Sequence, residues 1–270
     1  MSVVSFINLK GGVGKTSACL HLAGALALLG RRVLCVDNDP QSSLSSAFFG
    51  ADAARGLDPV GTIAAIYAGT DPLPGSVIRP SGFERIDLLP GSRAAGSYNN
   101  ADPHQAPHNL QVGLRDFLDL VRDRYDLVMI DCPPNLHLCS WAAMTASDAF
   151  VVPLQPEDFG AQGVADVMDS ASGVQTLVNS RLTLAGILVS MFQSRRAIHQ
   201  AYVARLREGN GPAVFTAMIP EAVDFVEAVT AGKPVGMHKP KGAAAKAVKA
   251  VAMELIERLA TPAVEAGEAA

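Results

Sequence analysis

The sequence predicts a doubly wound α/β fold, in which helices flank a mainly parallel β-sheet. Short apolar runs alternate with helical spacing about seven times along the chain, with no internal repeat and no clear linker. The first run, 2–7, leads through a glycine-rich turn into a helical pattern, and two later runs end in aspartate. Strands joined through helices pair in parallel, because each crossover returns the chain to the same edge of the sheet.

The composition indicates one large domain, which we expect to span residues 1–260. The 270 residues are 49% hydrophobic and 18% charged, and a chain of this length buries about 75% of its unfolded surface. The formal net charge of −4 argues against a protein coated in nucleic acid, although it leaves room for a local basic patch. Residues 261–270 are expected to form a disordered tail.

Cysteine usage and the N-terminal sequence favour a cytoplasmic protein. The four cysteines have no CxxC spacing, and Cys19, Cys35 and Cys132 lie inside apolar or motif segments, so we expect neither a disulfide framework nor a zinc site. No signal peptide is expected, because the first strand starts at residue 2. The longest apolar helical pattern, 18–29, is too short and too rich in alanine to span a bilayer.

The turn after the first strand carries the chemistry of a phosphate-binding loop. It precedes a helical pattern at 17–30, which is the context that such a loop requires. Its glycines let main-chain N–H groups approach phosphate oxygens, and the helix N-terminus adds about half a positive charge. The Lys15 ammonium can reach the β- and γ-phosphates, and the Thr16 hydroxyl can bind Mg²⁺. The expected nucleotide-binding residues are Lys10, Gly11, Gly12, Val13, Gly14, Lys15, Thr16 and Ser17.

The same turn departs from the ordinary phosphate-loop pattern at its start. Leu9 stands five positions before Gly14, where that pattern has glycine, and a second lysine, Lys10, opens the turn. Because the turn is short, Lys10 is poorly placed to reach the nucleotide of its own subunit. We predict that Lys10 reaches a phosphate in a facing subunit and acts in catalysis with Lys15. The alternative is a glycine-rich turn with surface lysines.

The second apolar run, 32–36, ends in Asp37-Asn38-Asp39-Pro40-Gln41. In open α/β sheets, ligands bind at the carboxyl ends of the strands, where these carboxylates are expected. We predict that Asp39 is catalytic and orients or activates the attacking water, while Asp37 supports the shell of Mg²⁺. The alternative is that both carboxylates only cap the next helix.

Residues 50–113 are less regular. A short helical pattern covers 62–67, a strand is predicted at 85–89, and 93–109 is expected to be a mobile surface loop. His104 and His108 are four positions apart, as in some metal sites, but a third ligand is not evident and Pro107 lies between them.

The run 125–131 follows a helical pattern at 110–121 and is an apolar strand that ends in Asp131. This is the Walker B arrangement, in which the aspartate holds Mg²⁺. Thr16, Asp39 and Asp131 are therefore the predicted metal residues. The Cys132-Pro133-Pro134 turn is rigid and is expected to act as a switch when the γ-phosphate leaves. A strand that ends in aspartate by chance is the alternative.

Three more strands are predicted at 149–154, 182–189 and 214–219, with a helix at 160–178. The segments 191–196 and 219–221 follow two of these strands, and one of them, including Pro220, is expected to frame the base of the nucleotide.

The C-terminal part has an asymmetric charge pattern. Residues 228–253 contain five lysines and no acidic residue, and the last helix has an apolar stripe at Val248, Val251, Leu255 and Leu259 that predicts docking on the sheet. The outward lysines are candidates for contact with a DNA backbone. An ordinary solvated lysine face is the alternative. The candidate DNA-binding residues are Arg195, Arg196, Lys239, Lys241, Lys246 and Lys249.

The segments 10–16, 37–41 and 131–134 occur in the order and spacing of the ParA/MinD superfamily of deviant Walker A P-loop NTPases. Over residues 1–260 the chain most resembles the ParA (Soj-like) branch, whose members partition chromosomes and plasmids. The segments 218–220, 227–228 and 232–234 are also similar to that branch.

This resemblance implies a cycle driven by ATP and Mg²⁺. ATP closes a sandwich homodimer in which each Lys10 reaches the partner's phosphates, and the dimer binds nucleoid DNA non-specifically. A ParB-like or cargo-adaptor protein then stimulates slow hydrolysis and release. By position, Lys15 contacts phosphates, Thr16 and Asp131 serve the metal, and Asp39 positions water. The implied cargo is plasmid or chromosomal DNA, and a protein organelle or receptor array is the alternative.

One departure from the branch concerns DNA binding. Glu221 and Asp224 stand where ParA proteins usually carry arginine. Either the lysines at 239–249 compensate, or the departure marks weak nucleoid affinity or another cargo.

Three other functions fit less well. A MinD-like membrane cycle needs a basic amphipathic helix at the C-terminus, whereas residues 261–270 are small and acidic, so no membrane partner is expected. An iron–sulfur relative needs paired cluster cysteines, and Cys132 and Cys139 have no suitable second pair. A module that only holds nucleotide is disfavoured by the presence of Lys10, Lys15 and Asp39.

Overall fold

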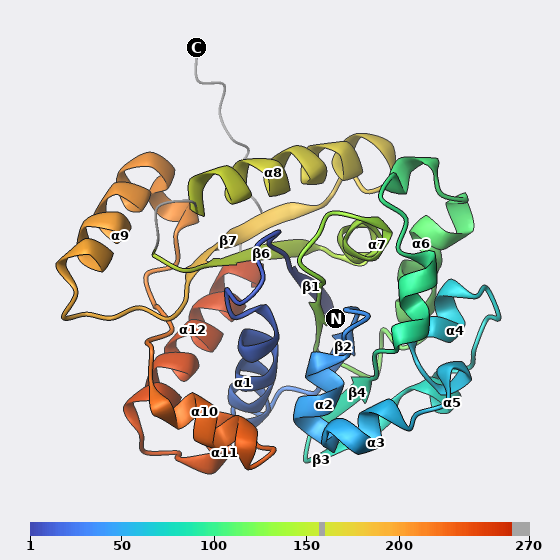
Figure 1. Cartoon of the computed structure of the whole chain (residues 1–270), viewed down its shortest axis with the longest axis horizontal. Coiled ribbons are helices and arrows are strands. Elements are labelled where there is room, and N and C mark those ends of the chain that lie inside the picture. The colour runs from blue at the N-terminus through green and yellow to red at the C-terminus, as the bar shows by residue number, and fades with distance from the viewer. Residues whose placement is uncertain (157–159, 261–270) are drawn as a thin grey trace.

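The computed structural model describes residues 1–156 and 160–260, so the tail expected at 261–270 lies outside the described residues. Its centre is a seven-stranded sheet of order β3-β4-β2-β5-β1-β6-β7 (Figure 1). Neighbouring strands pair in parallel, except for the antiparallel pair β3–β4 at one edge, which confirms the predicted fold class. The strands are β1 (Ser2–Phe6), β2 (Val33–Asp37), β3 (Arg79–Phe83), β4 (Ile86–Leu89), β5 (Leu127–Asp131), β6 (Ala149–Leu154) and β7 (Thr183–Val189).

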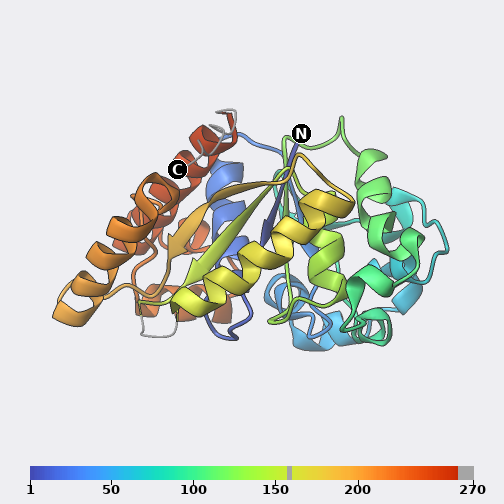
Figure 2. The same ribbon diagram turned by 90° about the horizontal axis from the view of Figure 1, so that it is seen from above.

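Helices cover both faces of this sheet (Figures 1 and 2). One face packs on α1 (Lys15–Leu28), α2 (Ser43–Phe49), α10 (Val223–Thr230), α11 (Val235–His238) and α12 (Ala243–Ala260). The other packs on α4 (Ile63–Tyr67), α6 (His108–Asp119), α7 (Leu138–Ala146) and α8 (Gly160–Leu177). The structure also contains the α-helices α3 (Ala51–Arg55), α5 (Pro74–Val77) and α9 (Ala197–Asn210). No helix in the two described ranges is long and apolar enough to cross a membrane.

The strands are apolar throughout because both of their faces are buried. In β1, Val3 contributes to one core, while Val4 and Phe6 contribute to the other. Alternate residues of a strand point to opposite faces, so a parallel strand covered by helices on both sides has a continuous apolar run. In the predicted α12 stripe, Val248, Val251 and Leu255 are each about 1% exposed, and Leu259 is partly buried and packs against the same core.

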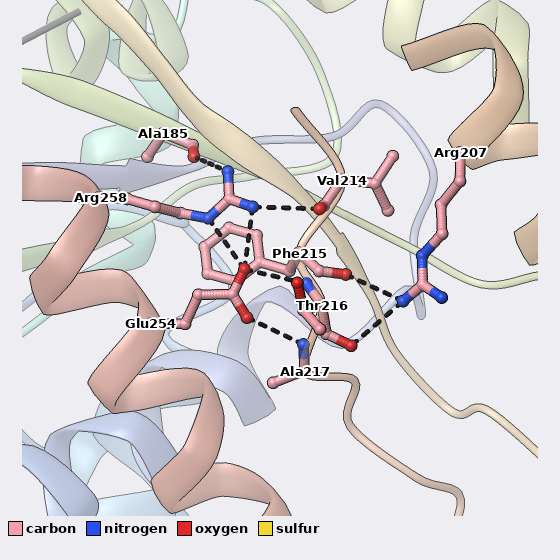
Figure 3. A network of polar contacts seen from close by, with 8 residues as sticks. All are labelled: Ala185, Arg207, Val214, Phe215, Thr216, Ala217, Glu254 and Arg258. Atoms are coloured by element: carbon pink, nitrogen blue, oxygen red, sulfur yellow. Dashed lines mark hydrogen bonds and ion pairs between the residues drawn. The ribbon is translucent and has the colours of Figure 1, made fainter. Parts of the chain in front are cut away.

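The strand predicted at 214–219 is wrong. Within this segment the described residues form one isolated bridge, Val214 with Ile187, and a second bridge, Pro220 with Phe192, lies directly after it. The N–H groups of residues 215 and 219 donate to carbonyl oxygens of β7, and several other main-chain groups are bound by side chains from two helices (Figure 3). The Glu254 carboxylate of α12 accepts from the N–H groups of residues 216 and 217, at 2.9 and 2.8 Å. Since these groups already have partners, a continuous strand ladder does not form.

Two arginines complete this side-chain network. Arg258 donates to the carbonyl oxygens of Ala185 and Val214, at 2.9 and 3.0 Å, and pairs with Glu254 at 2.9 Å. Its guanidinium lies over the Phe215 ring, 4.3 Å from the centroid. Arg207 of α9 approaches from the other side and donates to the carbonyls of residues 215 and 216 (Figure 3). The segment is therefore fixed against β7 by α9 and α12.

Two further differences lie in residues 50–113. The strand β3 was not predicted, because its sequence contains Pro80 and Gly82, which are tolerated here at an irregular sheet edge. The surface loop predicted at 93–109 instead forms two 3₁₀ helices, Arg93–Tyr98 and Pro103–Gln105, and the start of α6. Ala95 and Pro103 are buried, so this segment packs on the core.

Candidate active site

The turn between β1 and α1 has the backbone of an anion-binding loop. Gly12 and Gly14 have φ values of +79° and +91°, which L-residues rarely adopt. Gly14 is the N-cap of α1, and neither a side-chain cap nor an acidic residue occupies the first turn of this helix. The first N–H groups of α1 and the positive end of its dipole therefore face the turn, which suits a phosphate.

Lys15 is buried against this turn rather than extended into solvent. Its ammonium donates to the carbonyl oxygen of Asn8 at 2.9 Å and to that of Lys10 at 3.1 Å. Burial lowers the pKa of Lys15, and the neighbouring Asp131 carboxylate opposes that shift. Lys10, by contrast, is exposed at the start of the turn. The two predicted lysines therefore lie in different environments only five residues apart.

Thr16 and Asp131 meet at the carboxyl edge of the sheet. The Thr16 hydroxyl donates to Oδ2 of Asp131 at 2.6 Å, and Oδ1 of Asp131 has no hydrogen-bond partner among the described residues although it is buried. Burial, reinforced by the negative charge of Asp37, raises the pKa of Asp131. A hydroxyl and an orphaned carboxylate oxygen form a hard oxygen set, and Mg²⁺ prefers such ligands. The residues present therefore fit the predicted metal.

Asp37 lies directly opposite Asp131 in the register of β2 and β5. Its Oδ2 accepts from the N–H and the hydroxyl of Ser45, at 2.7 and 2.6 Å, in the first turn of α2. Burial raises the pKa of Asp37 to about 7. Because Oδ2 binds the first turn of α2, Asp37 does cap the next helix, as the alternative in the sequence analysis proposed. Oδ1 is buried without a partner within the described residues, so it remains available to a metal shell.

Asp39 is half-buried at the same edge of the sheet. Its Oδ1 accepts from the N–H of Gln41 at 2.9 Å, which closes a local turn. A carboxylate that is accessible to solvent and lies near Lys15 can hold a water molecule, whereas the fully buried Asp37 and Asp131 cannot approach bulk water.

A cavity of about 460 Å³ opens beside the N-terminus of α1, and it brings Gly14 and Ser17 together with Pro220. Both loops that were predicted to frame the base, 191–196 and 219–221, contribute to its wall. They are joined by main-chain hydrogen bonds of 3.0 Å from residue 192 to residues 219 and 221. Its lining is mostly apolar and includes Met191 and Phe225. An apolar cavity next to a phosphate-binding turn is suited to a nucleobase and its ribose.

Sequence reasoning missed several residues of this site. Ser190 donates to the carbonyl oxygen of Val13 at 2.5 Å and so ties the end of β7 to the turn. Ser45 holds Asp37, and Gly91 is required beside it because a Cβ there would lie 2.7 Å from the Asp37 carboxyl carbon. No sequence motif marks these contacts, because they join segments that are far apart in the chain.

The candidate DNA-binding residues lie on separate elements. Arg195 and Arg196 are exposed on the loop before α9, while Lys241, Lys246 and Lys249 are exposed next to or on α12. Lys239 differs from these, because its ammonium pairs with Asp224 at 2.8 Å and also with Glu227. These acidic partners raise the pKa of Lys239 to about 12. The positive charge of Lys239 is therefore largely neutralised within the chain.

The chain is similar to known proteins both in sequence and in structure. A family model described as an AAA domain matches residues 1–184. The chromosome-partitioning ATPase Soj of Thermus thermophilus is 36% identical over 256 residues, which cover 95% of this chain and 96% of Soj. The chromosome partitioning protein ParA of Caulobacter vibrioides is 32% identical over 260 residues, which cover 96% and 95%. Cobyrinic acid a,c-diamide synthase from Mycobacterium smegmatis, solved with an ATP analog and magnesium, is similar with a TM-score of 0.81 and 25% identity, covering 97% of this chain and 96% of that one.

Proposed function

The chain belongs to the ParA (Soj) family of partition ATPases, and on that premise we propose that it uses ATP to partition or position a cargo. It is an ATPase, with ATP as substrate and Mg²⁺ as cofactor. In this proposal residues 1–260 act as one ATPase domain, and DNA is the cargo.

The triphosphate lies along residues 10–17, and the base and ribose occupy the cavity at Pro220. Lys15 exchanges the carbonyls of Asn8 and Lys10 for the β- and γ-phosphates, so its ammonium keeps oxygen partners throughout. Asp39 orients the attacking water. Thr16, Asp131 and Asp39 would hold Mg²⁺, which when bound would supply positive charge to neutralise the phosphate oxygens.

The contrast between the two lysines of the turn carries the proposal of a sandwich dimer. Lys15 is buried and bound by its own turn, whereas Lys10 is exposed at the surface five positions earlier. A cation at the rim of a phosphate site can serve a second triphosphate when two copies face each other. ATP is then shared between the subunits, and the dimer depends on it.

The dimer is tested by measuring mass in solution and phosphate release. With a slowly hydrolysed ATP analogue and Mg²⁺, we expect light scattering to give twice the mass of the 28.2 kDa chain, and with ADP a monomer. Lys10→Ala should remain monomeric and lose hydrolysis, while Lys241→Ala, which removes another exposed lysine, should behave as wild type. Intact dimerisation and hydrolysis in Lys10→Ala would refute the role of Lys10.

We further propose that the dimer binds duplex DNA through its exposed basic residues, in the cytoplasm and on the nucleoid, until a ParB-like or adaptor protein stimulates hydrolysis. Phosphate contacts release counterions, so the affinity for random duplex DNA should fall steeply with salt. The residues in question are Arg195, Arg196, Lys241, Lys246 and Lys249, and replacing them with alanine should reduce the salt dependence.

A second candidate is the positioning of a cargo other than DNA. The pairing of Lys239 with Asp224 and Glu227 favours it, because this pairing reduces the positive charge near α12. The same salt titration distinguishes the two functions. An ATP-trapped dimer that fails to bind DNA at low salt would exclude partition through non-specific DNA binding and leave the second candidate.

A further inference from the structure

Asn38 lies between Asp37 and Asp39, and its side chain is completely buried. Its Nδ2 donates to the carbonyl oxygen of Cys139 at 2.6 Å, and its Oδ1 accepts from the Tyr67 hydroxyl at 2.7 Å. Its main-chain N–H donates to the carbonyl oxygen of Asp131 at 2.9 Å. This one residue therefore contacts β5, α4 and α7 at the edge of the sheet where the nucleotide site lies.

The contact with α7 falls at the start of that helix, directly after the turn that follows Asp131. The N–H of Cys139 donates to Oδ1 of Asn99 at 2.9 Å, and the Asn99 amide reaches Asn135, within the turn, at 3.4 Å. The N–H of residue 138 donates to the carbonyl of residue 100 at 2.9 Å. The amide of Asn38 is thus bonded to the point where the 132–137 turn enters α7.

We propose that Asn38 is a positioning residue that fixes the Asp39 carboxylate relative to the 132–137 turn, an inference that rests on the role proposed above for Asp39. Among the described residues, the Asp39 carboxylate accepts one hydrogen bond, from Gln41 two residues away, and this bond does not anchor the loop to another element. The anchoring comes from the preceding residue. A buried amide needs both a donor and an acceptor partner, and Tyr67 and Cys139 supply them in one orientation.

The chain contains one tryptophan, Trp141, which lies two residues after Cys139 in α7. Its indole N–H donates to Oε1 of Gln111 at 3.0 Å, and the side chain is buried. Intrinsic fluorescence therefore reports on the helix that Asn38 contacts. If Asn38 joins the Asp39 loop to the turn, a change at the γ-phosphate reaches Trp141 through that residue.

Two variants test the proposal. Asn38→Leu keeps a similar volume and removes both side-chain hydrogen bonds, and Tyr67→Phe removes only the hydroxyl. We expect kcat to fall about tenfold to a hundredfold in Asn38→Leu, and less in Tyr67→Phe, while the affinity for a fluorescent ATP analogue stays within about twofold. Tyr98→Phe is the control, since Tyr98 stacks on Tyr67 with ring centroids 6.5 Å apart and is not bonded to Asn38.

The second measurement is the difference in Trp141 fluorescence between the protein bound to a slowly hydrolysed ATP analogue and the protein bound to ADP. It should be present in the wild type and in Tyr98→Phe, and reduced to less than about half in Asn38→Leu. An amide that only stabilised the fold would lower the unfolding midpoint and leave kcat of the folded protein unchanged, which would overturn the proposal. If Asn38→Leu does not fold, an unchanged kcat in Tyr67→Phe has the same meaning.

Failure of the proposed function looks different from failure of this inference. If an Asp39→Ala variant hydrolyses ATP at the wild-type rate, the proposed role of Asp39 is wrong, and the premise of this inference falls with it. If hydrolysis requires Asp39 but Asn38→Leu has a normal kcat and a normal fluorescence change, only the proposed role of Asn38 is wrong.

Discussion

Gly186, within β7, is a position where one added methyl group tests the packing at the edge of the sheet. Its φ is +152°, a backbone conformation that L side chains rarely adopt. A Cβ there would lie 2.7 Å from the carbonyl oxygen of Ala213, 2.8 Å from Nη1 of Arg258 and 2.8 Å from the Phe215 ring. The guanidinium cannot withdraw easily, because it is bound to Glu254 and to two main-chain carbonyls (Figure 3).

The expected loss of stability has two parts. A non-glycine residue in such a backbone conformation costs about 1–3 kcal/mol. Forcing a methyl group into closely packed surroundings costs about 1–3 kcal/mol more, and the lower figure applies if β7 shifts. We therefore expect Gly186→Ala to lower the free energy of unfolding by about 2–6 kcal/mol.

The assay is urea denaturation followed by far-ultraviolet circular dichroism. Gly75→Ala in α5 is the matched control, because its Cβ would meet no atom within 4 Å and its φ is not positive, so its stability should stay within about 0.5 kcal/mol of wild type. Gly82→Ala, with a φ of +88° and open space around it, isolates the backbone contribution at about 1 kcal/mol. A loss below about 1 kcal/mol in Gly186→Ala would refute the packing argument.

Other substitutions test other parts of the fold. Gly24→Ala places a Cβ in steric conflict with the Pro234 ring. Urea denaturation should show that the free energy of unfolding falls by about 2 kcal/mol or more. An unchanged midpoint would contradict close packing of α1 on residue 234. Glu254→Ala leaves Arg258 and two main-chain N–H groups without their carboxylate partner. We expect the free energy of unfolding, measured by the same assay, to fall by about 3 kcal/mol. A fall below about 1 kcal/mol would mean that water replaces the carboxylate. Burial lowers the pKa of His21 to about 4 from an ordinary value of 6.5, so the unfolded chain binds more protons between these values. The contribution of His21 to stability should be complete above pH 6.5 and fall by about 3 kcal/mol as the pH drops to 4. It is measured as the difference in unfolding free energy between wild type and His21→Gln, because Asp37, whose pKa is raised to about 7, changes stability in the opposite direction in both proteins. A difference that does not vary with pH would refute the role of His21.

Much of the fold could be predicted because its signals are local. Parallel strands covered on both faces have continuous apolar runs, and six of the seven strands were recognised in this way. The same rule failed at 214–219, which is largely apolar but has several of its main-chain groups bound by Glu254, Arg258 and Arg207. Partners more than thirty residues away, such as Glu254, cannot be anticipated from a short run of residues.

The sequence by itself predicted the candidate phosphate-binding turn, because its glycines, Lys15 and Thr16 lie within a few consecutive residues. It also predicted that Asp37, Asp39 and Asp131 would meet, since parallel strands end at a common edge. Only the tertiary structure decided which polar groups bind one another there. It paired Asn38 with Cys139 across 101 positions, bound Asp37 to Ser45, and neutralised Lys239 with Asp224. Such pairs depend on the direction and burial of each side chain. The packing of helices on the sheet determines both, and neither can be read from the order of residues.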